Sequence, residues 1–364
     1  MAKTRSITRQ QKTLKTSEDG GSTSWSDLCL DLLVTVMMRL GLVDFVSFGG
    51  VCKRWRSIAH SKWKTFMGSK LPMCMFFSPF NRTDSWLEDF EGRRFKTKRR
   101  HGTHRTCVGT TRGYYILFGS RTSDFWLVNP ITRHEFHFTD FPSHKSTDCP
   151  GYFRGILIYS HSMSGWVFVV SHKFSNIISF SLAGSKQSSW PWNHISSSLP
   201  ILDMHLFNGK IYSLHIHARL CEVKLEPEPT FVPLQIKNFA IPAICPIEFV
   251  SSVKNLYVVG WVTKSIYKVL EVNFDTKEWE DPEKTIGQYA FYFSLMCTSS
   301  AAAATAIKPN TCASGRTRSK IICNRIVDQR RIKESGLRTI NNDVWYFPQD
   351  CLNVKLASEG EKED

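Results

Sequence analysis

From residue 74 to residue 347 the chain is a series of short apolar runs separated by turn residues. The runs are rich in Val, Ile, Phe, Tyr and Trp and are bounded by Gly, Asn, Ser or Pro. β-Branched and aromatic side chains suit a pleated surface and the flanking residues favour turns, so each run predicts a strand. The predicted strands are Cys74–Phe77, Tyr114–Phe118, Phe125–Val128, Ile156–Tyr159, Trp166–Val170, Ile177–Leu182, Ile211–Leu214, Leu256–Val259, Val269–Phe274 and Val344–Phe347.

A weak repeat runs through these strands. A strand that leads into a polar turn and then an aromatic residue recurs, and its equivalent positions lie 51, 43 and 50 residues apart. Those positions are Leu127, Ile178, Cys221 and Glu271. A second set, Tyr115, Tyr212, Tyr257 and Tyr346, is spaced by 97, 45 and 89 residues. One or two units of about 45–50 residues are the period of four-stranded propeller blades. The repeat favours a β-propeller; a non-repeating β-sandwich or two-sheet array is the alternative.

Two amphipathic runs precede this all-β region. In the first, apolar residues return at helical offsets to one face. They are Leu28, Leu32, Leu33, Val36 and Leu40. Asp31 suits the positive end of that helix, and Gly41 is a candidate helix stop.

The second run repeats at offsets of three and four. It contains Phe45, Phe48, Cys52, Trp55 and Ala59, with Asp44 as its expected cap. Gly49 and Gly50 interrupt the run at about 1 kcal/mol each relative to Ala, so two short helices are expected there. Short helices in so few residues form a marginal core, and such a module needs a partner surface to cover its remaining apolar face.

The same segment resembles the F-box. The resemblance rests on Leu28, Asp31-Leu32-Leu33, Arg39-Leu40, Asp44, Phe48 and the closing V-C-K-R-W-R-S of residues 51–57. Cys29 stands where the family usually has proline. Its loss removes a rigid helix start and leaves the apolar face intact, so docking is expected to be weakened rather than abolished. An ordinary helical-bundle fragment is the alternative reading.

The rest of the chain resembles the β-propeller domain that follows the F-box in a large plant family of F-box proteins. LVNPITRHEF, DMHLFNGKIYSLH and KVLEVNFDTKEWE carry the resemblance, and NDVWYFPQD (342–350) resembles the family's closing strand. Between Cys297 and Gly336 the resemblance fails, because the segment is Ala-rich and then basic. It is expected to be an exposed insertion or mis-spliced coding sequence.

These resemblances imply a multi-domain α+β chain. The expected parts are a disordered basic tail (1–24), the F-box (25–60), a propeller-like client-binding domain (71–356) with a disordered insertion (298–336), and an acidic tail (357–364).

The F-box resemblance implies a substrate receptor of a Skp–cullin–F-box ubiquitin ligase. A Skp-type adaptor would dock on this module and connect it to the cullin and RING subunits, while the β domain holds a client protein. The residues implied to form or support the adaptor-binding surface are Leu28, Leu32, Leu33, Val36, Leu40, Phe48, Val51 and Trp55. No cofactor is implied, and the expected location is the nucleus, the cytoplasm or both.

The formal net charge of +15 suggests a rival function, that of a nucleic-acid-binding regulator. The charge is confined to residues 1–24 (+3), 93–105 (+7) and 305–338 (+7), and the remainder is slightly acidic. No basic stripe with interleaved aromatic residues is visible, so nucleic-acid binding is not expected. Residues 93–105 are expected to form a flexible loop. A third possibility is an F-box protein whose β domain is too incomplete to hold a client.

Eleven cysteines without a Cys-x-x-Cys pair argue against a disulfide framework and against a zinc ribbon. They fit a reducing compartment. The uncharged stretch from Thr285 to Ile307 is diluted by Ser, Thr and Ala, so membrane insertion is not expected. The opening residues are basic without an apolar core, unlike a secretory signal peptide.

A search for catalytic chemistry finds no Gly-x-Ser-x-Gly elbow, phosphate-binding loop or His-Glu-x-x-His motif. His101 with His104, and His134 with His137, lack a third ligand for zinc. Asp203 with His205 is interpreted as a solvent-facing alternation on a strand, and Glu226 with Glu228 as a solvated turn. We therefore predict neither a catalytic nor a metal site.

Overall fold

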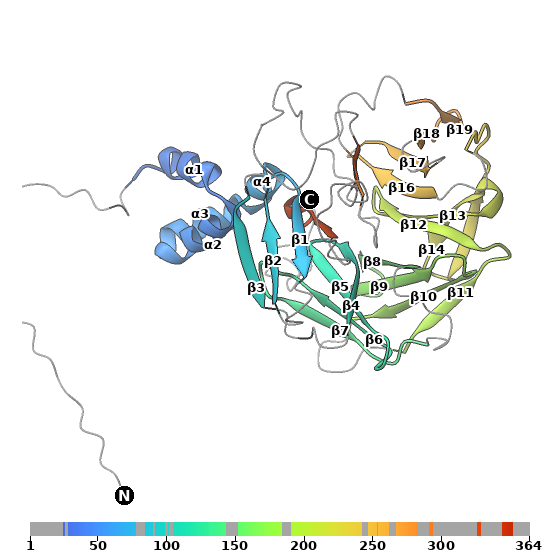
Figure 1. The fold of residues 1–364 in the computed structure, drawn as a ribbon, viewed down its shortest axis with the longest axis horizontal. Coiled ribbons are helices and arrows are strands. Elements are labelled where there is room, and N and C mark those ends of the chain that lie inside the picture. The colour runs from blue at the N-terminus through green and yellow to red at the C-terminus, as the bar shows by residue number, and fades with distance from the viewer. Residues whose placement is uncertain are drawn as a thin grey trace, which may run out of the picture. The chain divides into compact units, whose positions relative to one another are not determined.

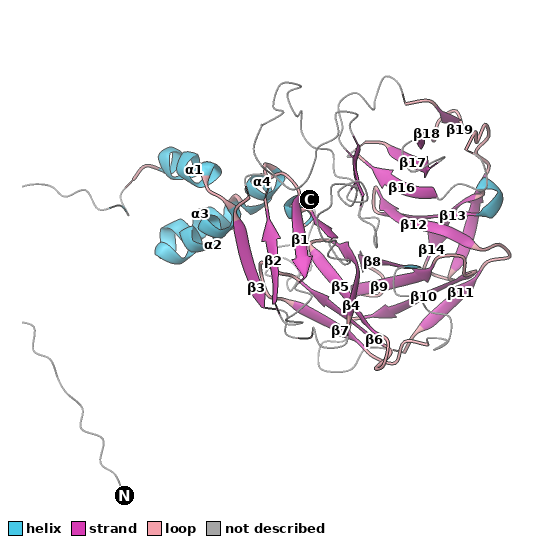
Figure 2. Cartoon of the chain, in the orientation of Figure 1, coloured by secondary structure: helices cyan, strands magenta, loops and turns pink. Residues whose placement is uncertain are grey.

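The computed structural model divides the chain into two units, Met1–Lys62 and Trp63–Asp364, which are treated separately. It describes residues 25, 28–77, 84–89, 92–98, 101, 105–142, 152–183, 191–241, 247–252, 254–261, 267–282, 291–293, 326–328 and 344–351. The predicted tails at 1–24 and 357–364 lie outside the described residues. Helices form the first unit and strands dominate the second (Figure 2).

Three short helices make up the first unit: α1 (Leu30–Arg39), α2 (Leu42–Val51) and α3 (Lys53–Ser61). Asp31 lies in the first turn of α1, as expected. The second run forms two short helices, as expected, but the break does not fall at Gly49 and Gly50, because α2 continues through both. The break falls at Cys52, whose extended backbone (φ −155°, ψ 173°) ends α2 and caps α3.

Two smaller expectations about helix ends hold only in part. α1 does end just before Gly41, with Leu40 as its C-cap, but Gly41 has φ −70° and serves as the N-cap of α2, so it is not a left-handed helix stop. Asp44 lies within the first turn of α2, where its carboxylate still favours the positive helix end. The turn at Cys52 lets Trp55 fold back on Phe48, with ring centroids 4.5 Å apart. Tertiary packing, rather than glycine flexibility, therefore decides where this run bends.

The second unit begins with α4 (Trp63–Gly68) and continues as five four-stranded sheets, named here as blades and given from the innermost strand outward. Blade 1 is β22 (Val344–Tyr346), β1 (Met73–Phe77), β2 (Asp84–Glu88) and β3 (Arg94–Lys98). Blade 2 is β4 (Thr106–Thr111), β5 (Tyr114–Gly119), β6 (Asp124–Val128) and β7 (Glu135–Phe138). Blade 3 is β8 (Phe153–Ser160), β9 (Gly165–His172), β10 (Ile177–Leu182) and β11 (Asn193–Ser196).

Blades 4 and 5 follow the same order. Blade 4 is β12 (Ile201–Phe207), β13 (Lys210–His215), β14 (Leu220–Lys224) and β15 (Thr230–Leu234). Blade 5 is β16 (Ile247–Ser251), β17 (Leu256–Trp261), β18 (Tyr267–Asn273) and β19 (Glu278–Glu280). A short 3-10 helix, η3 (Ile216–Ala218), lies between β13 and β14, and a second, η6 (Pro348–Asp350), follows β22.

The blades stand around a common axis as a five-bladed β-propeller (Figure 1). Neighbouring strands within every blade are antiparallel, and β4, β8, β12 and β16 pack in succession around the axis. Blade 1 is composite, since β22 from the end of the chain pairs with β1 in the register Met73↔Tyr346. The expected closing strand is thus confirmed. It ties the end of the chain to the start of the domain.

The repeat predicted from the sequence is confirmed in its main set. Leu127, Ile178, Cys221 and Glu271 all lie on the third strand of their blades. The tyrosine set is only partly equivalent: three of its members lie on second strands, whereas Tyr346 lies on the innermost strand of blade 1.

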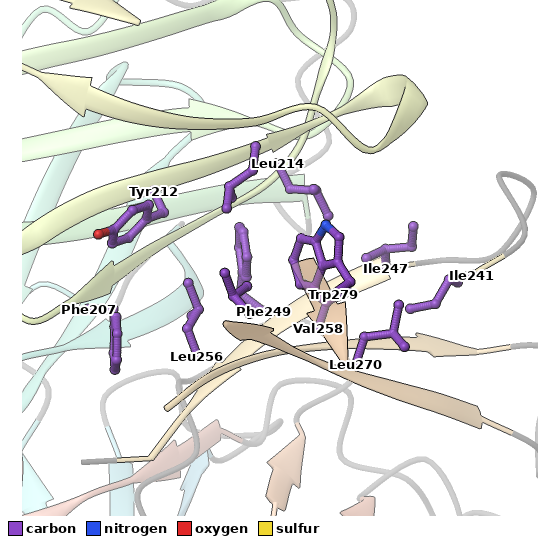
Figure 3. Close-up of a cluster of buried hydrophobic side chains, with 12 residues drawn as sticks. Phe207, Tyr212, Leu214, Ile241, Ile247, Phe249, Leu256, Val258, Leu270 and Trp279 are labelled. Carbon is purple, nitrogen blue, oxygen red and sulfur yellow. The ribbon is translucent and has the colours of Figure 1, made fainter. Parts of the chain in front are cut away.

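Apolar cores fill the spaces between successive blades. One cluster joins blades 2 and 3, a second joins blades 3 and 4, and a third joins blades 4 and 5. Figure 3 shows the third, in which Trp279, Leu214 and Phe249 from the two blades approach one another. A middle strand such as β5 is covered on both faces and all six of its residues are buried, so it reads as a continuous apolar run.

Two expectations about basic segments need correction. Residues 94–98 are not a loop: they form β3, which pairs with β2 at the outer edge of blade 1. Within 298–336 only residues 326–328 are described, and these form β21, paired in parallel with β20 (Phe291–Phe293). These three residues form a strand that was not expected, and β20 and β21 make a two-stranded sheet separate from the five blades.

No helix in the described part of the chain is long and apolar enough to cross a bilayer. None of the six cysteines within the described residues is in a disulfide: Cys29, Cys52, Cys74, Cys107, Cys221 and Cys351.

Candidate functional site

The first unit leaves six large aliphatic side chains in solvent. Three lie on α1 and three on α2, each at least two-fifths exposed. They are Leu30, Leu32, Val36, Val43, Val46 and Val51, and we call them the aliphatic surface. Leu32 and Val36 are four residues apart, and Val43 and Val46 three apart, so each pair shares a helical face.

The eight residues expected at this site divide into three groups. Leu32, Val36 and Val51 belong to the aliphatic surface. Leu33 and Phe48 are buried within the unit at 0% and 3% exposure, so they support the surface without belonging to it. The three half-buried residues are Leu28, Leu40 and Trp55.

The division follows from helical geometry. Successive residues on an α-helix point about 100° apart, so Leu32 and Leu33 cannot share one face. Leu33 and Met37 turn inward, with Met37 also fully buried. The expectation of one leucine face is therefore corrected to an inward row and an outward row on the same helix. Leu28 lies before α1 and takes no part in the helical row.

Sequence reasoning missed Leu30, Val43 and Val46. The sequence contains a signal for these residues. Aliphatic residues at helix positions outside the inward row are candidates for a second apolar face. Two rows of apolar residues on one short helix are more than its own core needs. A docking partner that covers the outward row would recover about 1.5–3 kcal/mol for each large side chain that becomes fully buried.

Cys29, which replaces the family's proline, is the N-cap of α1 with φ −61° and ψ 153°. Its carbonyl accepts the Leu33 N–H at 3.1 Å, and its side chain makes no cap hydrogen bond. Proline fixes φ near −65°, so the backbone here already has the shape that proline imposes. The departure from the F-box pattern leaves the start of α1 unchanged.

Asp203 and His205 in the propeller do not face solvent, which corrects their interpretation from sequence. Both are buried on β12. Asp203 Oδ1 accepts a hydrogen bond from Arg154 Nε at 3.0 Å, and its Oδ2 accepts the Phe249 N–H at 2.7 Å. Through these two hydrogen bonds Asp203 links the innermost strands of blades 3, 4 and 5.

His205 belongs to the same axial region. Its Nε2 lies 2.8 Å from Ser251 Oγ on β16. Desolvation lowers the pKa of His205 to about 4, against the opposing charge of Asp203, so the ring is neutral at physiological pH. A neutral imidazole hydrogen-bonded to one hydroxyl, with its carboxylate neighbour held by Arg154, is a structural crosslink.

The histidine pairs also have structural partners. His101 precedes Trp126 in the sequence and His137 follows it. Both imidazole rings stack on the Trp126 indole, with ring centroids 3.5 and 3.9 Å away. His101 Nε2 lies 3.0 Å from Glu135, and His137 Nε2 lies 3.0 Å from Asp124. His104 lies outside the described residues. Within the part of the chain that is described, no three His, Cys, Asp or Glu side chains converge as metal ligands.

Three arginines of the 93–105 segment, Arg93, Arg94 and Arg105, form ion pairs with carboxylates. Arg105 Nη2 lies 2.7 Å from Asp124, which is almost wholly buried, and Arg94 Nε lies 2.8 Å from Glu88. Burial alone would raise the pKa of Asp124, but hydrogen bonds from Arg105, Thr122 and His137 lower it overall. This part of the segment is built into the edges of blades 1 and 2.

Comparison with known families finds two matches. Residues 25–67 match the F-box domain, and residues 80–312, more than half of the chain, match the KIB1-4 beta-propeller. The second match extends beyond Cys297, so the expectation that the resemblance ends there is corrected as far as residue 312. No curated protein matches the chain.

Among solved structures, the WD40 domain of SCAP from fission yeast is 10% identical with a TM-score of 0.36, over 58% of this chain and 51% of that one. Hsv2 of Kluyvelomyces marxianus is 10% identical with a TM-score of 0.31, over 54% of this chain and 68% of that one. The chain thus spans about half the length of the SCAP domain that it matches.

Proposed function

Because the chain belongs to the KIB1-4 beta-propeller family and carries an F-box domain ahead of its propeller, we propose that it is the substrate-recognition subunit of a Skp–cullin–F-box ubiquitin ligase. The two domains together fit an F-box substrate-recognition adaptor, and F-box proteins are generally non-catalytic. The single observation that carries the proposal is an F-box unit whose two helices present an aliphatic surface to solvent.

In this proposal the aliphatic surface docks on a Skp-type adaptor, with Leu32, Val36 and Val51 in contact and Leu33 and Phe48 holding the helices in place. The adaptor connects the chain to a cullin and its RING partner. The propeller holds a client protein, and ubiquitin transfer becomes fast because a client lysine is held close to the charged conjugating enzyme. The complex would act in the nucleus, the cytoplasm or both.

Two rival functions receive less support. In a nucleic-acid binder the basic residues should be available to phosphate. Arg105 is largely buried and paired with Asp124, which removes one of the cations of the 93–105 segment from that role. An F-box protein with an incomplete β domain should lack a blade or its closure. Here five four-stranded sheets are present, and β22 completes the first of them.

Co-purification of the full chain with a Skp-type adaptor tests the proposal. Leu32→Glu with Val36→Glu places two charges on the aliphatic surface without touching the core, so we expect adaptor binding to be lost while the helical circular dichroism is kept. Phe274→Glu is the matched control, because Phe274 is a similarly exposed apolar residue in the propeller. Adaptor binding by the double variant would refute the proposed docking surface. Salt-sensitive retention on nucleic acid without adaptor binding would favour the rival.

A further inference from the structure

Among the three helices of the first unit, α2 exposes the least charge. Its only charged side chain is Asp44, and its other exposed residues are Val43, Val46, Ser47, Gly50 and Val51. The neighbouring helices expose more charged residues: Asp31 and Arg39 on α1, and Lys53, Arg54 and Arg56 on α3. The solvent side of a helix is normally polar, so the exposed side of α2 has the composition of a surface that a partner covers.

Four of these residues share one side of the helix. Val43, Val46, Ser47 and Gly50 are spaced by three and four residues, which returns each to the same side. We call these four residues the α2 face. The Ser47 hydroxyl donates to the Val43 carbonyl at 3.3 Å, so its polar group is turned back onto the helix backbone. The α2 face is therefore apolar and free of charge.

The fold of the unit gives no reason for glycine at position 50. Gly50 lies inside α2, without the left-handed backbone that favours glycine. A Cβ added to Gly50 would meet no atom within 4 Å. Glycine in a helix interior is less stable than alanine, so the free protein loses stability here without a compensating contact in the unit.

The adjacent Gly49 has a different environment. A Cβ added to Gly49 would lie 3.8 Å from the Cβ of Ala59 on α3, which is an ordinary van der Waals contact. The Gly49 carbonyl accepts a hydrogen bond from Arg56 Nε at 3.1 Å, also on α3. Gly49 thus belongs to the contact between α2 and α3, whereas Gly50 belongs to the outer surface.

A surface of two valines and an open glycine suits close contact with another helix. A helical valine has one strongly preferred χ1 rotamer, so Val43 and Val46 lose little side-chain entropy when a partner covers them. At Gly50 no side chain covers the backbone, and glycine is the usual residue where a backbone must be approached closely. Side chains at the contact set the distance between packed helices. The α2 face therefore admits a helix at short distance.

The F-box match identifies the partner that is expected on this face. It covers residues 25–67, which include all of α2, and F-box domains bind Skp1-type adaptors. The α2 face also contains Val43 and Val46 of the aliphatic surface.

We propose that an apolar helix of the Skp-type adaptor lies directly against the α2 face, and that Gly50 determines how closely it can approach. This inference rests on the proposed function. It makes α2 the main seat of the adaptor and Gly50 a residue that selects for a close-fitting partner helix. A side chain at position 50 would hold that helix away from Val43 and Val46, and the contacts of both valines would be lost together.

The test compares alanine at the two adjacent glycines. The affinity of the full chain for purified Skp-type adaptor is measured for Gly50→Ala and for its matched control, Gly49→Ala. Both changes add one methyl group inside the same helix, so we expect hydrogen–deuterium exchange of residues 28–61 to stay the same or slow in both. Adaptor affinity should fall by at least about tenfold in Gly50→Ala and stay unchanged in Gly49→Ala.

The exchange measurement separates a contact role from a structural one. If Gly50 served only the fold of its unit, Gly50→Ala would speed exchange and weaken binding together, and the inference would be overturned. Val46→Thr provides a second variant, because it nearly keeps the shape of the side chain and adds a hydroxyl that the adaptor helix would have to bury. We expect it to lower adaptor affinity several-fold without faster exchange.

Failure of this inference can be told apart from failure of the proposed function. If the unmodified chain does not bind the adaptor, both are overturned. If it binds and Gly50→Ala binds equally well, only the inference about Gly50 is overturned. Light scattering of the free chain tests the other occupant of an apolar helix face, a second copy of the chain. A dimer that Gly50→Ala disrupts, with adaptor affinity unchanged, would assign the α2 face to that copy instead.

Discussion

The side-chain amide of Asn129 donates a hydrogen bond to Cys351 Sγ at 3.2 Å, joining the β6–β7 turn of blade 2 to the end of the described chain. Asn129 Oδ1 meanwhile accepts the N–H groups of Ile131 and Thr132, at 2.9 and 3.0 Å. The carbonyl of Cys351 accepts the indole N–H of Trp63 at the start of α4, at 3.2 Å. Cys351 thus connects α4, blade 2 and the chain that follows β22.

Asn129→Ala should destabilise the propeller by about 2 kcal/mol, because it leaves buried polar groups without partners. Asn273→Ala is the matched control. Asn273 makes the same two side-chain hydrogen bonds, to the N–H groups of Asp275 and Thr276, but in an exposed turn where water can replace them. We expect it to cost less than about 1 kcal/mol. Urea unfolding of the two variants measures the difference, and equal losses would mean that the Cys351 connection contributes nothing.

Gly113→Ala should be more damaging than Gly209→Ala, although both glycines lie in turns between the first and second strands of a blade with φ of +76° and +73°. At Gly209 an added Cβ meets no atom within 4 Å, so only backbone strain of about 1 kcal/mol is expected. At Gly113 the added Cβ would collide with the backbone of Cys351, which adds about 1–3 kcal/mol. Melting temperatures of the two variants decide this. A Gly113→Ala melting temperature no lower than that of Gly209→Ala would show that the chain end at Cys351 can move aside.

Leu33→Ala and Leu32→Ala test the division of the first helix into inward and outward rows. Leu33 is fully buried, so its truncation should cost about 2–5 kcal/mol and open the F-box unit. Leu32 is 53% exposed, and its truncation should change stability by less than about 0.5 kcal/mol. Hydrogen–deuterium exchange of residues 28–61 in the full chain reports both effects. Faster exchange in Leu32→Ala than in Leu33→Ala would reverse the two assignments.

Stability should respond to pH through two buried groups of opposite sign. The pKa of His205 is lowered by burial to about 4, from an ordinary value of 6.5. Between pH 6.5 and 4, His205 therefore binds a proton in the unfolded chain but not in the folded protein. The free energy of unfolding falls as the pH drops through this range. The full effect is on the order of 3 kcal/mol. The pKa of Asp350 is raised by burial to about 6, against the opposing charge of Arg112, so its contribution to stability is lost as the pH rises from 3.8 to 6.

Single variants should separate the two groups. In the unmodified protein, His205 makes the free energy of unfolding increase as the pH rises from 4 to 6.5, and His205→Gln should remove this increase. Asp350 makes the free energy of unfolding decrease as the pH rises from 3.8 to 6, and Asp350→Asn should remove this decrease. Asp350 keeps part of its side chain in solvent, so we expect its effect to be the smaller. Urea midpoints measured across this pH range provide the test. Parallel profiles for all three proteins would show that neither group changes its pKa on folding.

The candidate site could be predicted from the sequence only in part. The F-box pattern located the module and named Leu32, Val36 and Val51, which the structure leaves exposed. It also placed Leu33 in the same face, because a pattern of similar residues does not say which of two adjacent leucines turns inward. That choice depends on where α3 packs against α1.

By itself the sequence determined the middle strands of the blades and their repeat. A strand covered on both faces, such as β9 with its run from Val167 to Val170, must be apolar throughout. Such a continuous apolar run can be recognised in the sequence alone. The closing strand at Val344–Tyr346 was also predicted, through the resemblance of residues 342–350 to the family's closing strand.

Only the tertiary structure decided the outermost strands and the axial residues. β3 (RFKTK) and β11 (NHIS) read as loops, because an outer strand has solvent on one edge and owes its pairing to the strand inside it. Asp203 and His205 read as a solvent-facing alternation, yet they are buried because the innermost strands of other blades close around them. Burial of a polar residue depends on partners that lie 46 to 49 positions away in the chain, and no local pattern of residues contains them.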